Sequence, residues 1–549
     1  MQAIKDLIRL YDTVRYLRPV QIYRRLWFRL YRPRPETGPE PDLRNPAGDW
    51  TKAVEKPECR FEGRRFRFLN VERECDFPAA WQRLEWGRLW LYNLHYFDCL
   101  AAVGEQPQKA GLIARWIADN PPGTGCGWEP YPLSLRIVNW IKWALAGNEL
   151  PDGALWSLAV QARWLRRRLE FHLLGNHLFA NGKALVFAGL FFAGAEAEGW
   201  LETGLSILGR EIPEQVLADG GHFERSPMYH AIILEDLLDL KNLFRVYGRE
   251  FPDRWDRACG RMGRWLKTMC HPDGEIALFN DAALGIAARP AALADYARRL
   301  GLRPESETDE ACGRGLKLPA SGYYVMAPEA GSRLFVDCGK IGPDYQPGHA
   351  HCDLLSLELS LGGKRVIVDS GCGIYVDGEI RRYNRGNRGH NTVTVDGRNQ
   401  SEVWGAHRCG RRARPLSAGL GEEDGGLVFR GSHDGYRFLS GRVIHQRKIS
   451  WRGQIIEVED RFNGSGRHRL DARLHINPEL SLSWQGDAAV IDLGHGRRLV
   501  IEPGMGLSLA VSDGFYCPEF GRCLPCQVLT WVQDTELPVC GGWRLTFSD

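Results

Sequence analysis

The sequence lacks an apolar run long enough to cross a bilayer, and its first 35 residues lack the continuous apolar segment and cleavage site of a signal peptide. It also lacks an excess of charge, since 71 Lys and Arg oppose 68 Asp and Glu for a formal net charge of +3. This balance excludes a general nucleic-acid-binding protein, although local Arg clusters can still attract an anionic polymer. We therefore expect no transmembrane segment and a cytoplasmic location, with the periplasm as the alternative.

Cysteine is present but lacks a disulfide pattern. The 15 cysteines are odd in number and scattered along a chain of 549 residues, which is typical of thiols in a reducing compartment. Cys523 and Cys526 form one CxxC, but no second pair of matching spacing follows. We interpret it as an ordinary loop and not as a zinc site.

The first 50 residues read as a basic leader that ends in a Pro-rich linker. Arg alternates with Leu, Ile, Tyr and Trp in residues 1–35, and this pattern predicts an amphipathic helix. Docking of that helix on the main domain is the favoured interpretation. Peripheral contact with a membrane surface through residues 1–35 is the alternative.

Two domains of different class follow the leader. Residues 51–315 are dominated by apolar residues at helical spacing, with short polar connections, and predict paired helices in a ring or arc. Residues 316–549 consist of short alternating runs separated by Gly-rich turns, which predict an antiparallel β-sandwich. The chain is therefore expected to be an α+β multidomain protein.

The first polar segment beside these runs contains Asn176, His177 and Asn181. If a helix begins near His177, Asn176 occupies its N-cap, and His177 and Asn181 share one face. The alternative is that Asn176 does no more than cap the helix.

A second segment spans residues 219–230. Ser226 and Pro227 fit the cap and first turn of a helix, so Tyr229 is expected in that first turn. The preceding loop holds His222, Glu224 and Arg225. The alternative for Tyr229 is an amphipathic anchor whose hydroxyl finds a structural partner.

Two further segments lie in the sheet domain. His349 and His351 share a face if the chain is extended, and two imidazoles on one face suit a metal. Residues 369–398 are rich in Arg, including Arg385 and Arg388, and Arg grips carboxylate or sulfate with two hydrogen bonds. The alternatives are exposed histidines and a solvated loop.

Together these segments resemble the heparinase II/III family, from about residue 85 to the C-terminus. The motifs that carry the resemblance are NLHYFD (93–98), GWEPYPLSLRIVNW (127–140), GNHLFANGKAL (175–185), DGGHFERSPMYH (219–230), HAHCDLLSLEL (349–359), VIVDSGCGIY (366–375) and GHNTVTVDGRNQ (389–400). The leader and residues 127–140 look most like members associated with bacterial surface-polysaccharide gene clusters.

The resemblance implies an incomplete (α/α) toroid followed by an antiparallel β-sandwich, with a cleft between them. It implies a polysaccharide lyase that eliminates across C4–C5 of a uronic acid and leaves a 4,5-unsaturated end. By motif, Asn176 and His177 correspond to the groups that neutralise the uronate, Tyr229 and His349 to the catalytic tyrosine and histidine, and Tyr383 to a second tyrosine of alginate-cutting relatives.

The resemblance also implies one structural zinc ion, held by His351, Asp369 and His390, and no organic cofactor. The expected partner is an anionic polysaccharide. The side chains expected to contact it are Asn181, His222, Glu224, Arg225, Arg385 and Arg388.

These residue types suit β-elimination. Hydrogen bonds from Asn176 and His177 would strengthen as negative charge spreads from C5 into the carboxylate, so they favour the transition state. Tyr229 would serve as base, as acid to the leaving oxygen, or as both, with His349 as its partner.

The zinc ligands raise a problem of register. A hairpin turn at Gly362-Gly363 pairs Leu361 with Lys364, and strict alternation then places His351 and Asp369 on opposite faces. Both can bind one metal only if the strand bulges or begins after His351.

Two other functions stay open at this stage. A toroid glycoside hydrolase needs two carboxylates that flank the glycosidic bond. The available carboxylates form no recognisable catalytic pair in the sequence: Glu129, Glu224, Asp273 and Asp281. A non-catalytic polysaccharide-binding or assembly protein is the third possibility, because a fold alone does not prove activity. The Asn, Tyr and His motifs favour an enzyme.

Overall fold

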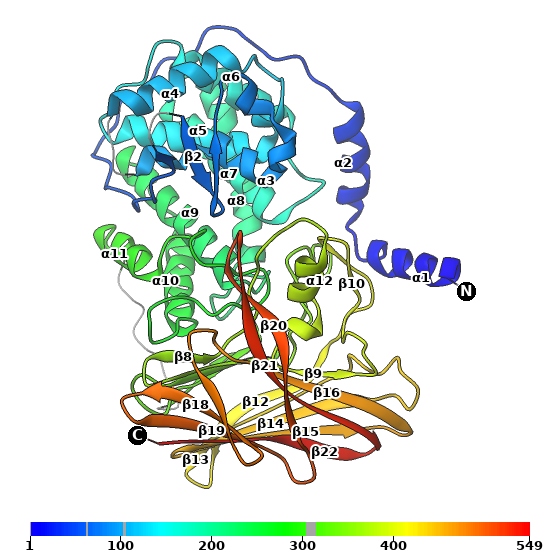
Figure 1. Cartoon of the computed structure of the whole chain (residues 1–549). Coiled ribbons are helices and arrows are strands. Elements are labelled where there is room, and N and C mark those ends of the chain that lie inside the picture. Colours follow the sequence, from blue (N-terminus) through cyan, green and yellow to red (C-terminus); the bar gives the residue numbers. More distant parts are fainter. Residues whose placement is uncertain (1, 62–63, 103–105, 303–313, 549) are drawn as a thin grey trace.

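Helices come first and antiparallel sheets second along the chain, as the change in residue pattern predicts (Figure 1). The computed structural model describes residues 2–61, 64–102, 106–302 and 314–548. Among these residues no helix is both long and apolar enough to cross a membrane.

The leader forms two helices at the edge of the molecule (Figure 1), and Arg168 of the helical domain donates hydrogen bonds to the Phe28 and Tyr31 carbonyls at the second of them. The two helices are α1 (Gln2–Val14) and α2 (Pro19–Leu30), and an extended segment connects α2 to the rest of the chain. A small three-stranded sheet follows, made of β1 (Arg60–Phe61), β2 (Arg65–Phe68) and β3 (Val71–Glu74).

The helical domain is the incomplete (α/α) toroid that the sequence predicts. Its helices are α3 (Arg88–Tyr96), α4 (Gln106–Asp119), α5 (Pro130–Leu145), α6 (Ala154–Arg167), α7 (Gly175–Phe191), α8 (Ala195–Gln215), α9 (Pro227–Val246), α10 (Asp253–Thr268) and α11 (Pro290–Arg299). Helix α7 is buried on nearly every side, as its apolar sequence predicts, and it packs against α5 and α8.

The sheet domain begins with a five-stranded antiparallel sheet. Its strands are β4 (Gly315–Leu318), β5 (Tyr323–Met326), β6 (Arg333–Asp337), β7 (Leu357–Leu361) and β8 (Lys364–Ile367). The short helix α12 (Glu379–Arg385) and the two-stranded pair β10 (Val403–Trp404) and β11 (Arg408–Cys409) lie in the connections that follow.

Two larger sheets complete the sandwich. The eight-stranded sheet has the order β12 (Pro415–Glu423), β13 (Gly426–His433), β14 (Ile444–Arg452), β15 (Ile455–Asn463), β22 (Val539–Phe547), β19 (Arg497–Pro503), β18 (Ala488–Gly494), β17 (Leu482–Gln485). The four-stranded sheet has the order β20 (Leu509–Glu519), β21 (Arg522–Glu536), β16 (Arg467–His475), β9 (Val393–Val395). One apolar core joins the three sheets, as expected for facing sheets with alternating inward residues.

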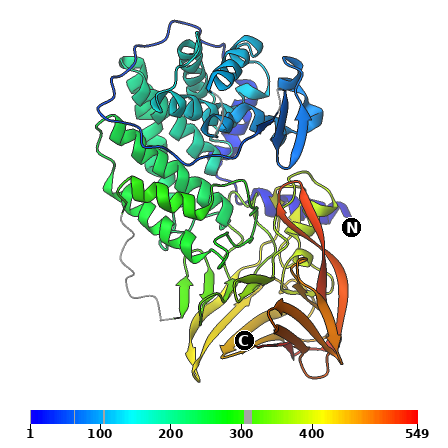
Figure 2. The same cartoon turned by 60° about the vertical axis from the view of Figure 1, so that its left-hand side comes forward.

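The β20–β21 hairpin links the two domains. It rises from the sandwich toward the helical domain and meets the β2–β3 hairpin (Figures 1 and 2). Asn70 of that hairpin donates hydrogen bonds to the Glu519 side chain at 2.9 Å and to the Phe520 carbonyl at 3.0 Å. Tyr516 and Phe520 are also part of the apolar core of the helical domain. The hairpin therefore helps to set how the sheet domain sits on the toroid.

Candidate functional site

Tyr229 occupies the first turn of α9, as its local sequence predicts. Ser226 is the N-cap, its hydroxyl accepts a hydrogen bond from the Tyr229 backbone N–H at 3.2 Å, and Pro227 is the first helical residue. Arg225, just before the cap, has a left-handed backbone with φ of 60°. A bulky residue in that region costs free energy that the surrounding structure must offset, and such positions cluster at functional sites.

The Tyr229 side chain meets the sheet domain. Its ring stacks on the imidazole of His349, with centroids 4.0 Å apart and planes 14° apart. Its hydroxyl lies 3.0 Å from the hydroxyl of Tyr375. Burial raises the pKa of Tyr229 well above its ordinary value, and the hydrogen bond from Tyr375 opposes that shift. The resting side chain is therefore a neutral phenol.

His349 is held by a carboxylate from the helical domain. Its Nδ1 lies 2.6 Å from Oε2 of Glu224. Burial alone would raise the pKa of Glu224, but the neighbouring His349 holds it below the ordinary value. Glu224 is thus an ionised acceptor that fixes the imidazole orientation, a role that the sequence does not predict for it.

Asn176 and His177 stand at the start of α7, but Asn176 is not its cap. Leu174 occupies the N-cap and Gly175 already begins the helix, so the predicted boundary is wrong by two residues. The reason is the positive φ of both Leu174 and Gly175, a turn that no helical periodicity signals. The side-chain oxygen of Asn176 is buried without a hydrogen-bond partner among the described residues, so capping does not account for it.

His177 carries an elevated pKa. Burial would lower that pKa, but the carboxylate of Glu170, 3.1 Å from Nδ1, raises it above the ordinary value. The Tyr131 ring lies 4.4 Å from the imidazole between centroids. Tyr131 therefore packs against the His177 ring.

Four of the predicted substrate contacts are buried against protein. The Asn181 amide donates to Glu170 at 3.1 Å and orients that carboxylate. The other three are His222, which contacts Gln215, Arg225, which donates to the Ser321 carbonyl, and Arg385, which donates to the Ala350 carbonyl. Their contact with a substrate remains a prediction. Arg388 alone among the predicted arginines is exposed.

Tyr383 belongs to a different group of residues. It lies on α12, and its hydroxyl is 2.7 Å from Nε2 of His475 on β16. Within the described chain no hydrogen bond or ring contact joins it to Tyr229 or His349. Tyr383 is therefore not in direct contact with Tyr229 or His349, and its catalytic role remains a prediction.

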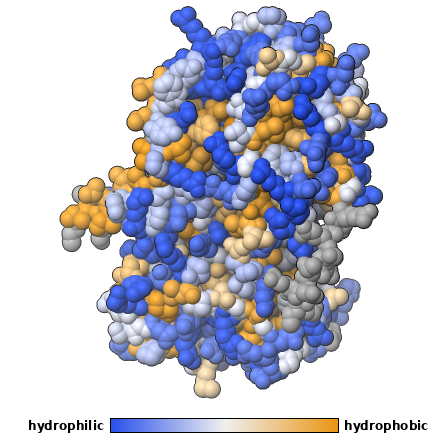
Figure 3. Space-filling model, turned by 180° about the vertical axis from the view of Figure 1, so that it is seen from behind, coloured by the Kyte–Doolittle hydropathy of each residue, from blue (hydrophilic) through white to orange (hydrophobic). Residues whose placement is uncertain are grey.

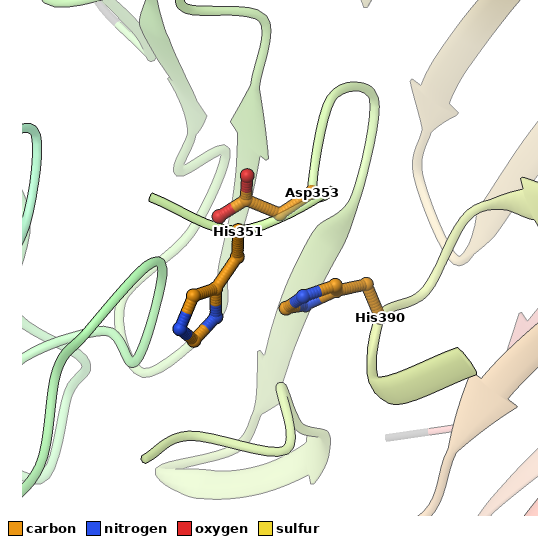
Figure 4. Close-up of side chains that lie close together, drawn as sticks. All are labelled: His351, Asp353 and His390. Atoms are coloured by element: carbon orange, nitrogen blue, oxygen red, sulfur yellow. The ribbon is translucent and has the colours of Figure 1, made fainter. Parts of the chain in front are cut away.

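A possible metal site is formed by His351, Asp353 and His390, whose ligand atoms all lie within 4.8 Å of one another (Figure 4). Asp353 stands beside the two histidines, where the sequence predicts Asp369. Asp369 lies 2.7 Å from Nδ1 of His390. The two predicted histidines therefore come together, and Asp369 remains a predicted ligand next to them.

The chemistry of the two imidazoles fits a metal ion. One nitrogen of each ring is held by a carboxylate, since Nε2 of His351 lies 2.8 Å from Asp281 and Nδ1 of His390 contacts Asp369. The other nitrogens, Nδ1 of His351 and Nε2 of His390, are buried with no hydrogen-bond partner in the described residues. Carboxylates that orient metal-binding histidines in this way are common around zinc.

The register of β7 meets the condition under which His351 and Asp369 could bind one metal. Leu361 pairs with Lys364 as predicted, but β7 begins at Leu357, after His351, and a bulge lies between Leu359 and Ser360. Alternation along the strand therefore does not extend to His351 and does not exclude Asp369. The irregular segment before β7 also places Asp353 close to both histidines.

Sequence reasoning missed three residues that complete the site: Tyr131, Glu170 and Tyr375. Tyr131 and Tyr375 lie inside motifs that resemble the family, but the resemblance assigned no function to either residue. Glu170 lies just after α6, which ends at Arg167, and none of the motifs includes it. The loop that follows α6 brings this carboxylate to His177 and Asn181.

Comparison with known proteins places both domains in one family. Residues 147–307 match the family model "Heparinase II/III N-terminus", and residues 313–533 match "Heparinase II/III-like, C-terminal". A heparin-sulfate lyase of Bacteroides stercoris is 30% identical over 250 residues, which cover 42% of this chain and 37% of that protein. An FtsZ-localized protein C of Caulobacter vibrioides is 30% identical over 268 residues, covering 47% and 44%.

The chain thus spans less than half the length of these curated relatives. Among solved structures, the heparan sulfate lyase HepC of Pedobacter heparinus superposes with a TM-score of 0.60 at 19% identity, covering 88% of this chain and 81% of that one. A heparinase III structure gives a TM-score of 0.66 at 18% identity, with 85% and 77% covered. At these identities the solved structures establish the fold of a toroid followed by a sandwich.

Proposed function

The chain belongs to the heparinase II/III family, and we propose that it cleaves a uronic-acid-containing polysaccharide by β-elimination, leaving a 4,5-unsaturated uronate end. The observation that carries the proposal is the meeting of Tyr229 with His349 and Tyr375 where the two domains join. Family relatives named heparin-sulfate lyase support this reaction class.

The carboxylate of the substrate is neutralised from the α7 side. The elevated pKa of His177 favours its protonated form, and an imidazolium next to the Asn176 amide suits a sugar carboxylate. As the C5 proton leaves, negative charge moves into that carboxylate and both interactions strengthen. The stabilisation is therefore greater in the transition state than in the ground state.

Tyr229 and His349 divide the proton transfers. His349, oriented by ionised Glu224, accepts the C5 proton through its remaining nitrogen. The C5 electron pair forms the C4–C5 double bond, the C4–O bond breaks, and the leaving oxygen takes the phenolic proton of Tyr229. The raised pKa of Tyr229 fits an acid that keeps its proton until then. Return of the proton from His349 to Tyr229 restores the resting enzyme.

The hydrolase alternative receives little support from the carboxylates. Each of the four candidates is engaged by the protein: Glu129 by Tyr92, Glu224 by His349, Asp273 by Arg365 and Asp281 by Arg381. A glycosidase needs an acid and a second carboxylate free to face the bond.

We also propose that His351, Asp353 and His390 hold one structural zinc ion. Two imidazoles and one carboxylate are ligands that zinc accepts, with one coordination position left over. When bound, the ion would tie the segment before β7 to the segment before β9. It would supply rigidity to this part of the sheet domain.

The experiment that tests the proposed reaction uses a panel of uronate polysaccharides, including heparan sulfate, and records the ultraviolet absorbance of unsaturated ends. We expect absorbance with at least one polymer and a loss of about 10²–10⁴-fold in Tyr229→Phe. Tyr324→Phe, in the five-stranded sheet, is the matched control and should keep full activity.

Two results would refute the lyase assignment. The first is new reducing ends without absorbance, which indicates hydrolysis. The second is tight polymer binding without any product across the panel, which indicates a binding protein. An unaltered rate in Tyr229→Phe would refute the catalytic role of Tyr229.

A further inference from the structure

The two leader helices dock on the protein mainly through polar contacts, with Val20 and Phe28 of α2 also packed against it. On α1, the Thr13 hydroxyl accepts a hydrogen bond from the Trp404 indole at 3.1 Å, and the Arg9 guanidinium lies 4.9 Å from the same ring. On α2, Gln21 donates to the Tyr345 carbonyl at 3.2 Å, and Arg18 pairs with Glu214. The leader is therefore docked, as the favoured interpretation of the sequence expects.

The opposite sides of both helices are apolar and exposed. On α1 these residues are Ile4, Leu7, Ile8, Leu10, Tyr11 and Val14, and on α2 they are Ile22, Tyr23, Leu26, Trp27 and Leu30. We call these eleven side chains the leader apolar face. They make up over half of the large exposed hydrophobic side chains in the described part of the chain. Seen from behind, α1 projects from the body of the molecule as a hydrophobic arm (Figure 3).

This arrangement is the reverse of an ordinary surface helix. An amphipathic helix on a globular protein buries its apolar stripe and exposes its polar side. Here the residues at helical spacing on α2, such as Ile22, Leu26 and Leu30, face away from the toroid while Gln21 is buried. Exposed apolar patches of this kind mark interaction surfaces on soluble proteins.

The charge of the leader identifies the partner. Residues 2–34 contain nine Lys and Arg against two Asp, whereas the whole chain carries only +3. The two aspartates are already paired within α1, with Arg9 and Arg15. Arg25 and Arg29, both exposed, border the apolar stripe of α2. A second copy of the chain would oppose two strongly basic faces, so a homodimer is disfavoured by repulsion.

We propose that the leader apolar face binds an anionic phospholipid surface. Leu, Ile and Val side chains would enter the acyl boundary, and Arg25 and Arg29 would contact lipid phosphates. Tyr11, Tyr23 and Trp27 have the amphipathic rings that settle at headgroup depth. The contact is peripheral. Because α1 and α2 are also docked on the body of the molecule, they would hold the Tyr229 site at the membrane surface.

The test is cosedimentation of the full chain with vesicles of phosphatidylcholine, alone or with about one-third phosphatidylglycerol. The variant Leu26→Ser/Trp27→Ser removes two side chains that are 59% and 51% exposed. The matched control Leu416→Ser/Trp484→Ser removes the same residue types at 55% and 47% exposure on the sandwich. We expect binding to anionic vesicles that is at least tenfold weaker in the leader variant and unchanged in the control.

Other results overturn the proposal. Equal binding to neutral and anionic vesicles, no binding at all, or equal losses in both double variants would each contradict it. So would a wild-type dimer in light scattering that becomes a monomer in Leu26→Ser/Trp27→Ser, since a second copy would then cover the face. Cleavage of a soluble polysaccharide should be the same in all three proteins, which separates this test from that of the lyase reaction.

Discussion

The hydroxyl oxygens of Tyr229 and Tyr375 lie 3.0 Å apart, although 146 positions separate the two residues in the sequence. Tyr229 comes from the first turn of α9 and Tyr375 from the segment after β8. The guanidinium of Arg381 lies 4.9 Å from the Tyr375 ring and is itself paired with Asp281 at 2.9 Å. Tyr375 is thus held from both sides, and the pair of tyrosines joins the two domains at the proposed reaction centre.

Replacement of Tyr375 by Phe should lower kcat several-fold, to about tenfold, with little change in KM. The hydrogen bond from Tyr375 lowers the pKa of Tyr229 against the larger effect of burial, so its loss makes Tyr229 a weaker acid toward the leaving oxygen. One hydrogen bond of this kind contributes about 0.5–1.5 kcal/mol. Steady-state kinetics on the polymer that the enzyme cleaves best would measure the effect. A wild-type kcat would show that Tyr375 plays no part in tuning Tyr229.

Replacement of Glu170 by Gln should move the alkaline limb of kcat/KM to lower pH. Burial lowers the pKa of His177 and the Glu170 carboxylate raises it, so the neutral amide leaves burial unopposed. The protonated imidazole that neutralises the uronate is then lost at a lower pH. Gln keeps an oxygen that can accept the hydrogen bond from Asn181. A pH profile that is unshifted, or shifted upward, would remove His177 from the proposed role.

Replacement of Arg447 by Met should destabilise the sandwich by about 3–5 kcal/mol at neutral pH. Burial alone would raise the pKa of Asp460, but Arg447, 2.7 Å away, and His445 hold it below the ordinary value. A carboxylate with a depressed pKa stabilises the fold above its unfolded pKa of about 3.9 and loses that contribution as pH falls. The difference in free energy of unfolding between the wild type and Arg447→Met should therefore become smaller at low pH.

Urea unfolding at two pH values checks this prediction. Arg469, whose partner Asp534 is exposed, provides the control, because a surface pair contributes little. A loss of stability in Arg469→Met as large as that in Arg447→Met would contradict the role of burial.

Replacement of Asp353 by Asn should abolish stoichiometric zinc, whereas Asp369→Asn should leave the ion bound with about 10–100-fold lower affinity. Asp353 stands with His351 and His390 in the cluster, while Asp369 only orients His390. Elemental analysis of the purified proteins, followed by titration with a chelator, distinguishes the two effects. Zinc retained in Asp353→Asn and lost in Asp369→Asn would restore the ligand set expected from the resemblance.

The two aspartates also show where prediction from sequence ended. The Gly362-Gly363 hairpin and the pairing of Leu361 with Lys364 follow from local turn chemistry and are confirmed. Which aspartate faces His351 depends instead on where β7 begins and on a bulge within it. Neither feature has a sequence signature, because both arise from how the strand packs on its neighbours.

The partner of Arg385 could not be predicted from the sequence either. Arg385 looked suited to a carboxylate, yet its guanidinium is buried on the Ala350 and Gly405 carbonyls. Arg side chains satisfy buried main-chain oxygens as readily as they bind anions, and composition does not distinguish the two uses. Glu224 is a second example, because the sequence predicts a contact with the polymer and the structure shows a contact with His349.

The sequence by itself determined the order of helices and strands, the burial of α7 and the place of Tyr229 in the first turn of α9. Those features depend on periodicity and caps, which neighbouring residues set within a few turns of chain. Only the tertiary structure decided that Tyr229 meets Tyr375, that Asp353 joins the histidines and that the leader turns its apolar side outward. Contacts between residues that are distant in the sequence depend on how whole elements dock, and no local pattern encodes that geometry.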